Sequence, residues 1–196
     1  MHHDDVRPKV FGIVLSAGAG SRFRGPSHKL TSTLRGRPVI AWAVDAARAA
    51  DLAGVIVVTG AIPLDLPERV IVVHNERWAE GQAMSLQLGI ATAIAHGADA
   101  VVVGLGDQPF ITPDTWTAVA AADAPIVVAT YDGVRGNPVR LDHTVWPLLP
   151  ATGDHGARSL MALRPDLVSQ LACSGSAADI DTMEDLRQWN SSTNSP

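Results

Sequence analysis

Short, almost wholly apolar runs alternate along this chain with stretches of helical periodicity, and this alternation limits the fold more than any other feature. Apolar runs of strand length occupy residues 10–16, 54–59, 70–74 and 100–105. Helical patterns occupy residues 38–50 and 82–96, and Thr112 followed by Pro113 marks the start of another helix. Strands separated by helices predict an α/β fold: a Rossmann-like three-layer sandwich with a mostly parallel sheet covered on both faces.

The second half of the chain continues with shorter elements. Residues 126–130 and 139–141 have strand patterns, with a hairpin-like excursion around Gly133 and Gly136 between them. Helices are expected at residues 157–163 and 182–188, the latter starting with a Thr182–Asp185 capping pattern. The length of 196 residues suits a single domain over residues 1–196. We expect an ordered core over about 10–188 and frayed tails at 1–8 and 190–196.

The charge is uneven along the chain. The net charge is −5, yet residues 6–44 contain no Asp or Glu and hold seven of the fifteen Lys and Arg residues. A basic segment on an acidic protein indicates that this segment binds a small anion at one site rather than a long polyanion, so we expect no nucleic acid partner. No apolar run approaches the roughly 20 residues of a membrane helix, so no membrane partner is expected. The single cysteine, Cys173, cannot form an intramolecular disulfide, which favours a reducing cytoplasm.

A loop of small residues follows the first strand, at residues 16–22 (SAGAGSR). Ligands of such sheets bind beyond the carboxyl ends of the strands, and successive amides can surround a phosphate. Arg22 and Lys29 add positive charge. A P-loop is excluded because Gly25 is followed by Pro26, and a dinucleotide fingerprint is disfavoured because Phe23 replaces its third small residue. A Gly-rich turn without a ligand is the plainer alternative.

Three aspartates are candidates for a magnesium site. Asp107 directly follows the strand 100–105, while Asp179 and Asp181 lie near the end of the chain. Mg²⁺ favours a few carboxylates together with substrate phosphates and water. The alternatives are a turn residue for Asp107 and helix capping for Asp181. The residues leave the choice between Asp179 and Asp181 open.

Several motifs, in order, resemble those of the molybdenum-cofactor nucleotidyltransferases, which comprise cytidylyltransferase and guanylyltransferase branches. The first is Leu15-Ser16-Ala17-Gly18 with Arg22 and Lys29, although these two basic residues are seven apart, two more than is usual in the family. The remaining matches are Asn75, Trp78, Gly81 and Ser85, then Gly106-Asp107-Gln108-Pro109, Gly136-Asn137-Pro138, Gly153-Asp154-His155-Gly156-Ala157-Arg158 and Asp179-Ile180-Asp181-Thr182. The motifs around 136–138 and 153–158 match the cytidylyltransferase-like branch.

The resemblance implies a fold of the nucleotide-diphospho-sugar transferase type and assigns a role to each matching position. Nucleotide binding would fall to Leu15, Ser16, Ala17, Gly18, Ala19, Gly20, Arg22, Lys29, Gly81, Ser85 and Asp107. Catalysis would rest on Arg22, Lys29 and Asp107, with Mg²⁺ held by Asp107 and Asp181. Acceptor binding would involve Gln108, Asn137, Asp154 and Arg158.

The implied reaction transfers a nucleoside monophosphate from an NTP to a phosphorylated acceptor of the molybdopterin type, with release of pyrophosphate. Transient contact with a molybdoenzyme or a cofactor-delivery protein is also implied. The methyl group of Ala17, where the guanylyltransferase branch carries glycine, favours the smaller base and therefore CTP over GTP. Two alternatives stay open: another nucleotidyltransferase with an alcohol-phosphate or sugar-phosphate acceptor, and a nucleotide-binding regulatory module without turnover. Lys29 and the metal carboxylates argue against the module.

Overall fold

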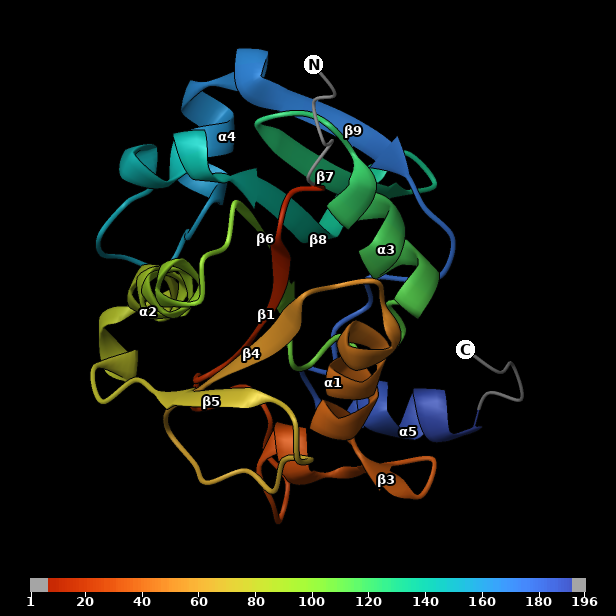
Figure 1. The fold of residues 1–196 in the computed structure, drawn as a ribbon. Helices are drawn as coiled ribbons and strands as arrows, with labels where there is room; N and C mark the ends of the chain where they lie inside the picture. Colours follow the sequence, from red (N-terminus) through yellow and green to blue (C-terminus); the bar gives the residue numbers. More distant parts are fainter. Residues whose placement is uncertain (1–6, 192–196) are drawn as a thin grey trace, which may run out of the picture.

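The computed structural model describes residues 7–191, and its centre is a seven-stranded sheet in the order β5-β4-β1-β6-β8-β7-β9 (Figure 1). The strands are β1 (Val10–Ser16), β4 (Gly54–Thr59), β5 (Ile71–His74), β6 (Ala100–Leu105), β7 (Ile126–Tyr131), β8 (Val134–Asp142) and β9 (Val168–Ala172). Every neighbouring pair is parallel except β6–β8 and β8–β7, because β8 alone runs against its neighbours. The predicted mostly parallel α/β sheet is confirmed.

Helices cover both faces of this sheet and complete the three layers. On one face lie α1 (Val39–Ala49) and α3 (Pro113–Ala121), and on the other α2 (Gln82–Ala95) and α4 (Arg158–Leu163) (Figure 1). A small hairpin of β2 (Thr33–Leu34) and β3 (Arg37–Pro38) packs near α5 (Met183–Ser191). The 3₁₀ helices are η1 (Lys29–Thr31), η2 (Trp78–Glu80), η3 (His143–Leu148) and η4 (Pro165–Leu167).

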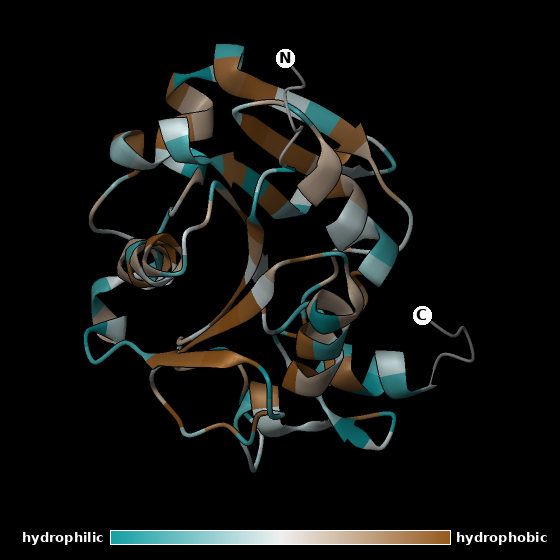
Figure 2. Ribbon diagram, viewed as in Figure 1, coloured by the Kyte–Doolittle hydropathy of each residue, from teal (hydrophilic) through white to brown (hydrophobic). Residues whose placement is uncertain are grey.

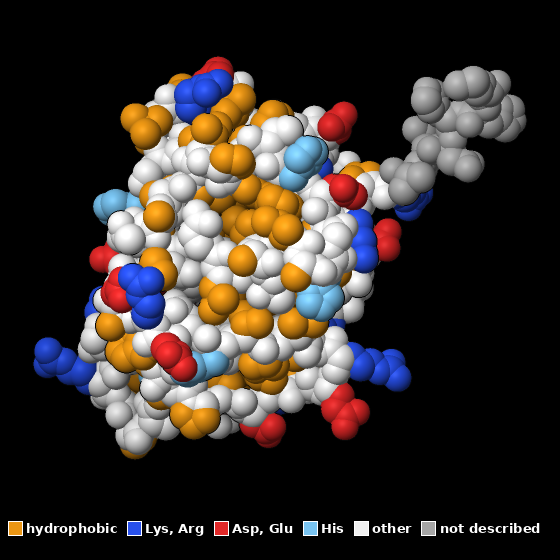
Figure 3. Space-filling view, turned by 60° about the vertical axis from the view of Figure 1, so that its left-hand side comes forward, with side chains coloured by type: hydrophobic (Ala, Val, Ile, Leu, Met, Phe, Trp, Pro, Cys, Tyr) orange, Lys and Arg blue, Asp and Glu red, His pale blue; other side chains and the backbone are white. Residues whose placement is uncertain are grey.

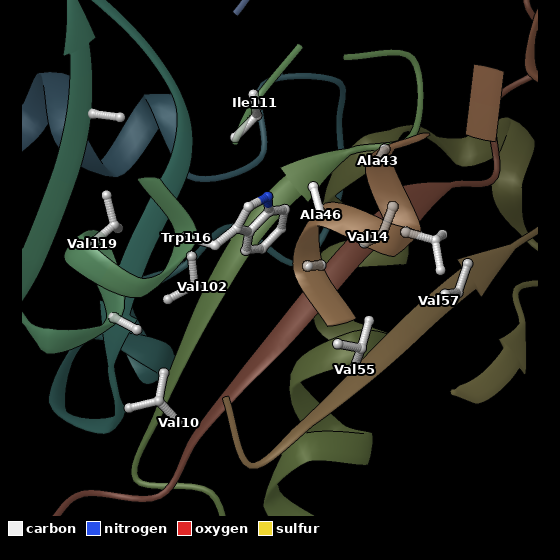
Figure 4. Packing of buried hydrophobic residues seen from close by; sticks show 14 of the residues in the cluster. Val10, Val14, Ala43, Ala46, Val55, Val57, Val102, Ile111, Trp116 and Val119 are labelled. Atoms are coloured by element: carbon white, nitrogen blue, oxygen red, sulfur yellow. The ribbon is translucent and has the colours of Figure 1, made fainter. Parts of the chain in front are cut away.

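Burial on both faces explains why the central strands are continuous apolar runs. All seven residues of β1 are buried, and Figure 2 shows the central strands as the most hydrophobic part of the ribbon. On the α1–α3 face, Val14, Val57 and Val102 belong to one buried cluster with Ala43 and with Trp116, which is 1% exposed (Figure 4). Small alanines on α1 let that helix approach the valine-rich strands closely.

Two predicted helix starts are confirmed in atomic detail. Thr112 caps α3, since its Oγ1 accepts a hydrogen bond from the Thr115 amide at 3.3 Å. At α5, the Asp185 carboxylate accepts from the Thr182 amide at 2.8 Å, and Thr182 Oγ1 accepts from the Asp185 amide at 3.1 Å. This reciprocal pair is a capping box with Asp in the place of Glu.

Other boundaries differ from the sequence prediction. Pro38 was expected in the first turn of a helix but pairs with Thr33 in the small hairpin, and α1 begins one residue later. β8 begins at Val134 rather than at residue 139, so Gly136 lies within a strand. β9 was not predicted, because its side chains are mostly half-exposed or exposed and lack a clear apolar pattern.

The C-terminal end of the described chain is more ordered than expected. α5 continues through Asn190 and Ser191, where a frayed tail was predicted to begin. The Asn190 side chain accepts from the Arg35 amide at 2.7 Å and donates to the Thr33 carbonyl at 3.2 Å, which ties the helix to the β2–β3 hairpin. The predicted tail segments 1–6 and 192–196 lie outside the described residues. Between residues 7 and 191, no helix is long and apolar enough to cross a membrane.

Candidate active site

A cavity of about 550 Å³ opens at the carboxyl ends of β1 and β6, between the loop after β1 and the start of α2. Every residue predicted to bind nucleotide lines it: Leu15, Ser16, Ala17, Gly18, Ala19, Gly20, Arg22, Lys29, Gly81, Ser85 and Asp107. Asp181 and Asp154 line it as well. Segments far apart in the sequence thus meet at one edge of the sheet, where ligands of open α/β sheets usually bind.

A compact cluster of charges lies in this cavity. Lys29 Nζ is 2.5 Å from Asp107 Oδ2 and 2.9 Å from Asp181 Oδ1. The three side chains are only 13%, 16% and 19% exposed, respectively. Arg22 reaches the other oxygen of Asp181 at 2.9 Å but keeps 75% of its side chain exposed. Lys29 therefore holds the two carboxylates together, and Arg22 stands at the open side.

The charge state of Lys29 follows from its two partners. Burial by itself lowers the pKa of Lys29, but the charge of Asp107 and the hydrogen bonds to Asp107 and Asp181 outweigh burial. The pKa of Lys29 is therefore raised, and its ammonium group stays protonated at neutral pH. The cation of this site is permanent over the whole physiological range.

Two polar atoms on the floor of the cavity have no hydrogen-bond partner within the described part of the chain. They are Asp107 Oδ1 and Ser16 Oγ, and both are fully buried. Gly106 packs directly against Ser16, since a Cβ added at Gly106 would collide with Ser16 Oγ and with Ile40. Glycine at this position lets β1 and the Asp107 turn pack closely. An unpaired buried carboxylate oxygen is costly, and a cation bound at Asp107 would satisfy it.

These residues fit a magnesium ion that is shared with a substrate. In the range 7–191, no group of three or more His, Cys, Asp or Glu side chains could hold a metal on its own. Mg²⁺ usually takes only one or two protein carboxylates and fills its shell with phosphates and water. Asp107, with one unpaired oxygen, and Asp181, on the other side of Lys29, supply such a pair.

Asp179 lies on a different side of the cluster from Asp181. Its Oδ1 accepts from Gln108 Nε2 at 2.6 Å, and it lines a second cavity. Partial desolvation and the nearby charge of Asp107 raise the pKa of the Asp179 carboxyl. Of the two aspartates that the sequence left open, only Asp181 shares Lys29 with Asp107.

The start of α2 forms the wall opposite the charge cluster. Ser85 is 3% exposed, and its Oγ accepts from Asn75 Nδ2 at 2.9 Å, which leaves the hydroxyl proton available to a ligand. Gly81 precedes α2 at φ +108°, and a Cβ there would lie 2.6 Å from the Gly153 carbonyl. The loop at Gly153 and Asp154 therefore packs against the start of α2. Asp154, which was predicted to bind the acceptor, lines this first cavity, called the nucleotide-side cavity below because the residues predicted to bind nucleotide line it.

A second cavity of about 620 Å³ adjoins the first and shares Leu15, Gln82 and Leu105 with it. Three of the four predicted acceptor residues line it: Gln108, Asn137 and Arg158. Much of its wall is apolar, from Leu86, Val103, Val128, Val139, Leu141 and Met161. Hydrophobic side chains also gather in the middle of the face seen in Figure 3, and most charged ones lie nearer its margins.

The polar floor of this second cavity is a hydrogen-bonded chain. Gln108, 5% exposed, donates to Asp179 and to the Ala177 carbonyl at 3.0 Å and accepts from Asn137 Nδ2 at 2.9 Å. Tyr131 donates its hydroxyl proton to the Asn137 carbonyl at 2.7 Å. Gln108 and Asn137 thus fix the shape of the floor, besides facing whatever binds there.

Several residues at the two cavities were not predicted from the sequence, among them four with polar side chains. Gln82 borders both, Arg135 and His155 line the second, and His28 contacts the loop at the first. Arg135 and Arg158 reach the second cavity from β8 and α4, and neither forms an ion pair within residues 7–191. The only signal for Arg135 in the sequence was its place two positions after the β7–β8 turn at residues 132–133.

Comparison with known proteins places this geometry in a family. Residues 12–171 match the model of the MobA-like NTP transferase domain. The chain belongs to this family. It is therefore a nucleotidyltransferase enzyme, as the motifs predicted.

Individual relatives agree with the family match. The purine catabolism protein PucB of Bacillus subtilis is 29% identical over 195 residues, covering 91% of this chain and 94% of PucB. The crystal structure of Rv0371c from Mycobacterium tuberculosis superposes with a TM-score of 0.76 at 28% identity, over 94% of this chain and 98% of that one. A second structure of Rv0371c, in complex with manganese, gives a TM-score of 0.73 at 26% identity, over 94% and 100% of the two chains.

Proposed function

We propose that this enzyme transfers CMP from CTP to the phosphate of a molybdopterin-type acceptor, with Mg²⁺ as cofactor and pyrophosphate as the other product. One observation carries the proposal. Lys29, Asp107 and Asp181 form a charge cluster in the nucleotide-side cavity, and the residue after Asp107, Gln108, lines the adjoining cavity. The reacting phosphates of two substrates can therefore meet at the carboxyl end of β6.

The chemistry requires charge stabilisation and alignment rather than a general base. An acceptor phosphate is already an anion, so the protein must reduce the repulsion between two anions and hold them in line. Bound at Asp107 and Asp181, Mg²⁺ would supply positive charge to the phosphates of the NTP. Lys29 shares the carboxylates of Asp107 and Asp181 with that ion, so bound Mg²⁺ would weaken its contacts with them and its ammonium group becomes available to phosphate oxygens. A single cation of this kind contributes about 3 kcal/mol or more to such a transition state.

The phosphates have a second set of donors in the loop after β1. Gly18, Ala19 and Gly20 line the cavity together with Arg22, and their backbone amides would donate to phosphate oxygens. Because Arg22 is largely exposed, it stands where a leaving pyrophosphate passes to solvent. Its role would be to bind the charge that builds on the leaving group.

The preference for CTP rests on Ala17. Ala17 is 5% exposed and lines the nucleotide-side cavity, and its methyl group faces Gly60 at the end of β4. The methyl group narrows the space between the loops after β1 and β4, which disfavours a purine. Since one methyl group changes discrimination by about 1–3 kcal/mol, we expect a preference rather than an absolute choice. The free hydroxyl proton of Ser85 would reach the base or ribose.

The lining of the second cavity supports an acceptor with a flat ring system, whose faces pack on aliphatic side chains and whose hydrogen-bonding groups lie along the ring edge. A sugar phosphate presents hydroxyl groups all round, and each would need a polar partner when buried. Here aliphatic side chains form much of the wall, and the polar groups are those of the floor together with Gln82, Ser176 and the three residues Arg135, His155 and Arg158. A pterin with an anionic side chain matches this distribution better.

The test is a pyrophosphate-release assay with Mg²⁺, each of the four NTPs, and either molybdopterin or a panel of sugar 1-phosphates. We expect the highest rate with CTP and molybdopterin, and GTP should be used more slowly. A higher rate with a sugar phosphate would refute the acceptor, while a GTP preference would refute the base assignment. NTP binding without pyrophosphate release from any acceptor would instead favour a regulatory module.

A further inference from the structure

His28 lies between the phosphate-binding loop and the turn that carries Lys29. Its ring is half-buried, with Nε2 3.1 Å from the Gly18 carbonyl oxygen and Nδ1 3.2 Å from the Leu30 amide nitrogen. His28 is also the N-cap of η1, the 3₁₀ helix in which Lys29 is the first residue. One imidazole thus touches both segments that supply cations and amides to the nucleotide-side cavity.

The two contacts determine the tautomer of the ring. A backbone amide can only donate, so Nδ1 must accept the hydrogen bond from Leu30 and carry no proton. A neutral imidazole then has its proton on Nε2, which donates to the Gly18 carbonyl. Both hydrogen bonds exist together only in this neutral tautomer, because a charged ring has protons on both nitrogens.

We infer that His28 is a positioning residue: it joins the phosphate-binding loop to the Lys29 turn and so sets the two phosphate-contacting segments relative to each other. The inference rests on the proposed function, because it concerns the same nucleotide. It also explains how the seven-residue spacing from Arg22 to Lys29 still brings both residues to Asp181. The ring also packs against Gly20: its Nε2 lies 3.0 Å from the position that a Cβ of residue 20 would occupy. The ring therefore contacts the longer loop on its inner side.

The surroundings of the ring favour its neutral form. Burial lowers the pKa of His28, Lys29 on the same turn lowers it further, and Asp107 at the end of β6 opposes the effect. Gly18 and Ala19 of the phosphate-binding loop face the ring with backbone groups only, and these raise the pKa. Because the pKa of His28 is lowered from 6.5, the ring is neutral and both hydrogen bonds are intact at neutral pH. As the pH falls through the pKa of His28, Nδ1 gains a proton and can no longer accept from Leu30, while Nε2 still donates to the Gly18 carbonyl.

Two substitutions separate the two hydrogen bonds. His28→Asn keeps an acceptor close to the backbone, where it can still cap Leu30, but it is too short to reach Gly18. His28→Gln places an amide donor near the position of Nε2 and restores the bond to Gly18. His28→Ala removes both, and His96→Gln, an exposed histidine at the far end of α2, is the matched control.

Two readouts are measured on each variant at pH 7.5: the Kd for CTP with Mg²⁺ by calorimetry, and hydrogen exchange of the amides of residues 18–23 without ligand. One hydrogen bond to the loop is worth about three- to tenfold in affinity. We expect His28→Ala and His28→Asn to raise the Kd by that factor and to accelerate exchange, while His28→Gln and His96→Gln stay near wild type. Lowering the pH to 5.5 should accelerate exchange of the Leu30 amide, relative to its intrinsic rate, in wild type but not in His28→Gln, whose side chain does not titrate; residues 18–23 should stay protected in both, because Nε2 of the charged ring still donates to Gly18.

The outcomes decide between positioning and capping. Wild-type exchange in His28→Asn, together with accelerated exchange in His28→Gln, would show that only the cap of Leu30 matters and would overturn the inference. Unchanged exchange in His28→Ala would overturn it too. If wild type bound neither CTP nor GTP, the proposed function would fail, yet the exchange rates of the free protein would still decide the role of His28.

Discussion

Replacing Lys29 by methionine is the sharpest perturbation of the charge cluster. Methionine keeps the length of the side chain and removes its charge, so Asp107 and Asp181 are left facing each other without the cation that now contacts both. The free protein should lose stability, and the metal site should lose its internal competitor. In the presence of Mg²⁺ these two effects oppose each other: loss of the cation lowers the free energy of unfolding, and tighter binding of Mg²⁺ raises it.

The size of the loss follows from the geometry. Two unit charges about 5 Å apart repel each other by roughly 3 kcal/mol at an effective dielectric constant of 20. All three side chains keep some contact with water, which weakens this repulsion. We therefore expect Lys29→Met to lower the free energy of unfolding by about 2 kcal/mol, or the melting temperature by about 4–8 °C for a chain of this size.

The assay is thermal unfolding in EDTA and in 5 mM Mg²⁺, both without nucleotide. Mg²⁺ should recover most of the lost stability of Lys29→Met and change wild type little, because Lys29 holds the carboxylates in the free protein. Lys9→Met, which removes the only other lysine of the sequence, an exposed one, should match wild type in both buffers. Nucleotidyl transfer by Lys29→Met should fall by about 100-fold or more at saturating Mg²⁺. Equal stability of wild type and Lys29→Met in EDTA, or no selective recovery by Mg²⁺, would refute the reasoning.

Four further results are expected. Arg22→Ala should weaken NTP binding by about tenfold or more with little change in melting temperature, since Arg22 is largely exposed; a large stability loss with unchanged binding would contradict this. Ser16→Ala should stabilise the free protein by about 1 kcal/mol in denaturant titration, because it removes a buried, unpaired hydroxyl; a destabilised variant would contradict this. Ala17→Gly should narrow the preference for CTP over GTP in direct competition, and an unchanged ratio would count against the methyl argument. Asp179→Asn should raise the melting temperature at pH 7, since the raised pKa of Asp179 means that its charged form is disfavoured in the folded state. This gain should disappear below about pH 3.8, and a gain that persisted there would contradict the assignment.

The parts of the fold that the sequence predicts well are those set by burial on both faces. β1, β4 and β6 occur at the predicted bounds because buried central strands must be continuous apolar runs. β9 was missed because a partly exposed strand at the edge of the sheet carries residues such as Ser169 and Gln170. The direction of β8 depends on the β7–β8 turn and on which strand it joins, which is a tertiary property.

In the candidate site, too, some residues could be predicted from the sequence, whereas the positions of others depend on tertiary packing. Arg22, Lys29, Asp107 and Asp181 could be named from motifs, and the structure brings all four into contact. The position of Asp154 on the nucleotide side depends on how the Gly153 loop packs on α2, which no local pattern encodes. The role of His28 is equally invisible in the sequence, since a histidine beside a lysine has no distinctive spacing.

The most direct test of the central claim is to identify the product that forms from CTP, Mg²⁺ and molybdopterin by mass spectrometry. Wild type and Asp107→Asn would be compared at equal concentration, after circular dichroism has shown that both are folded. We predict that wild type forms a CMP-linked molybdopterin and pyrophosphate in equal amounts, and that Asp107→Asn forms neither at a rate within about 100-fold of wild type. A wild-type enzyme that makes no CMP-linked product, or an Asp107→Asn variant that makes it at the wild-type rate, would contradict the account.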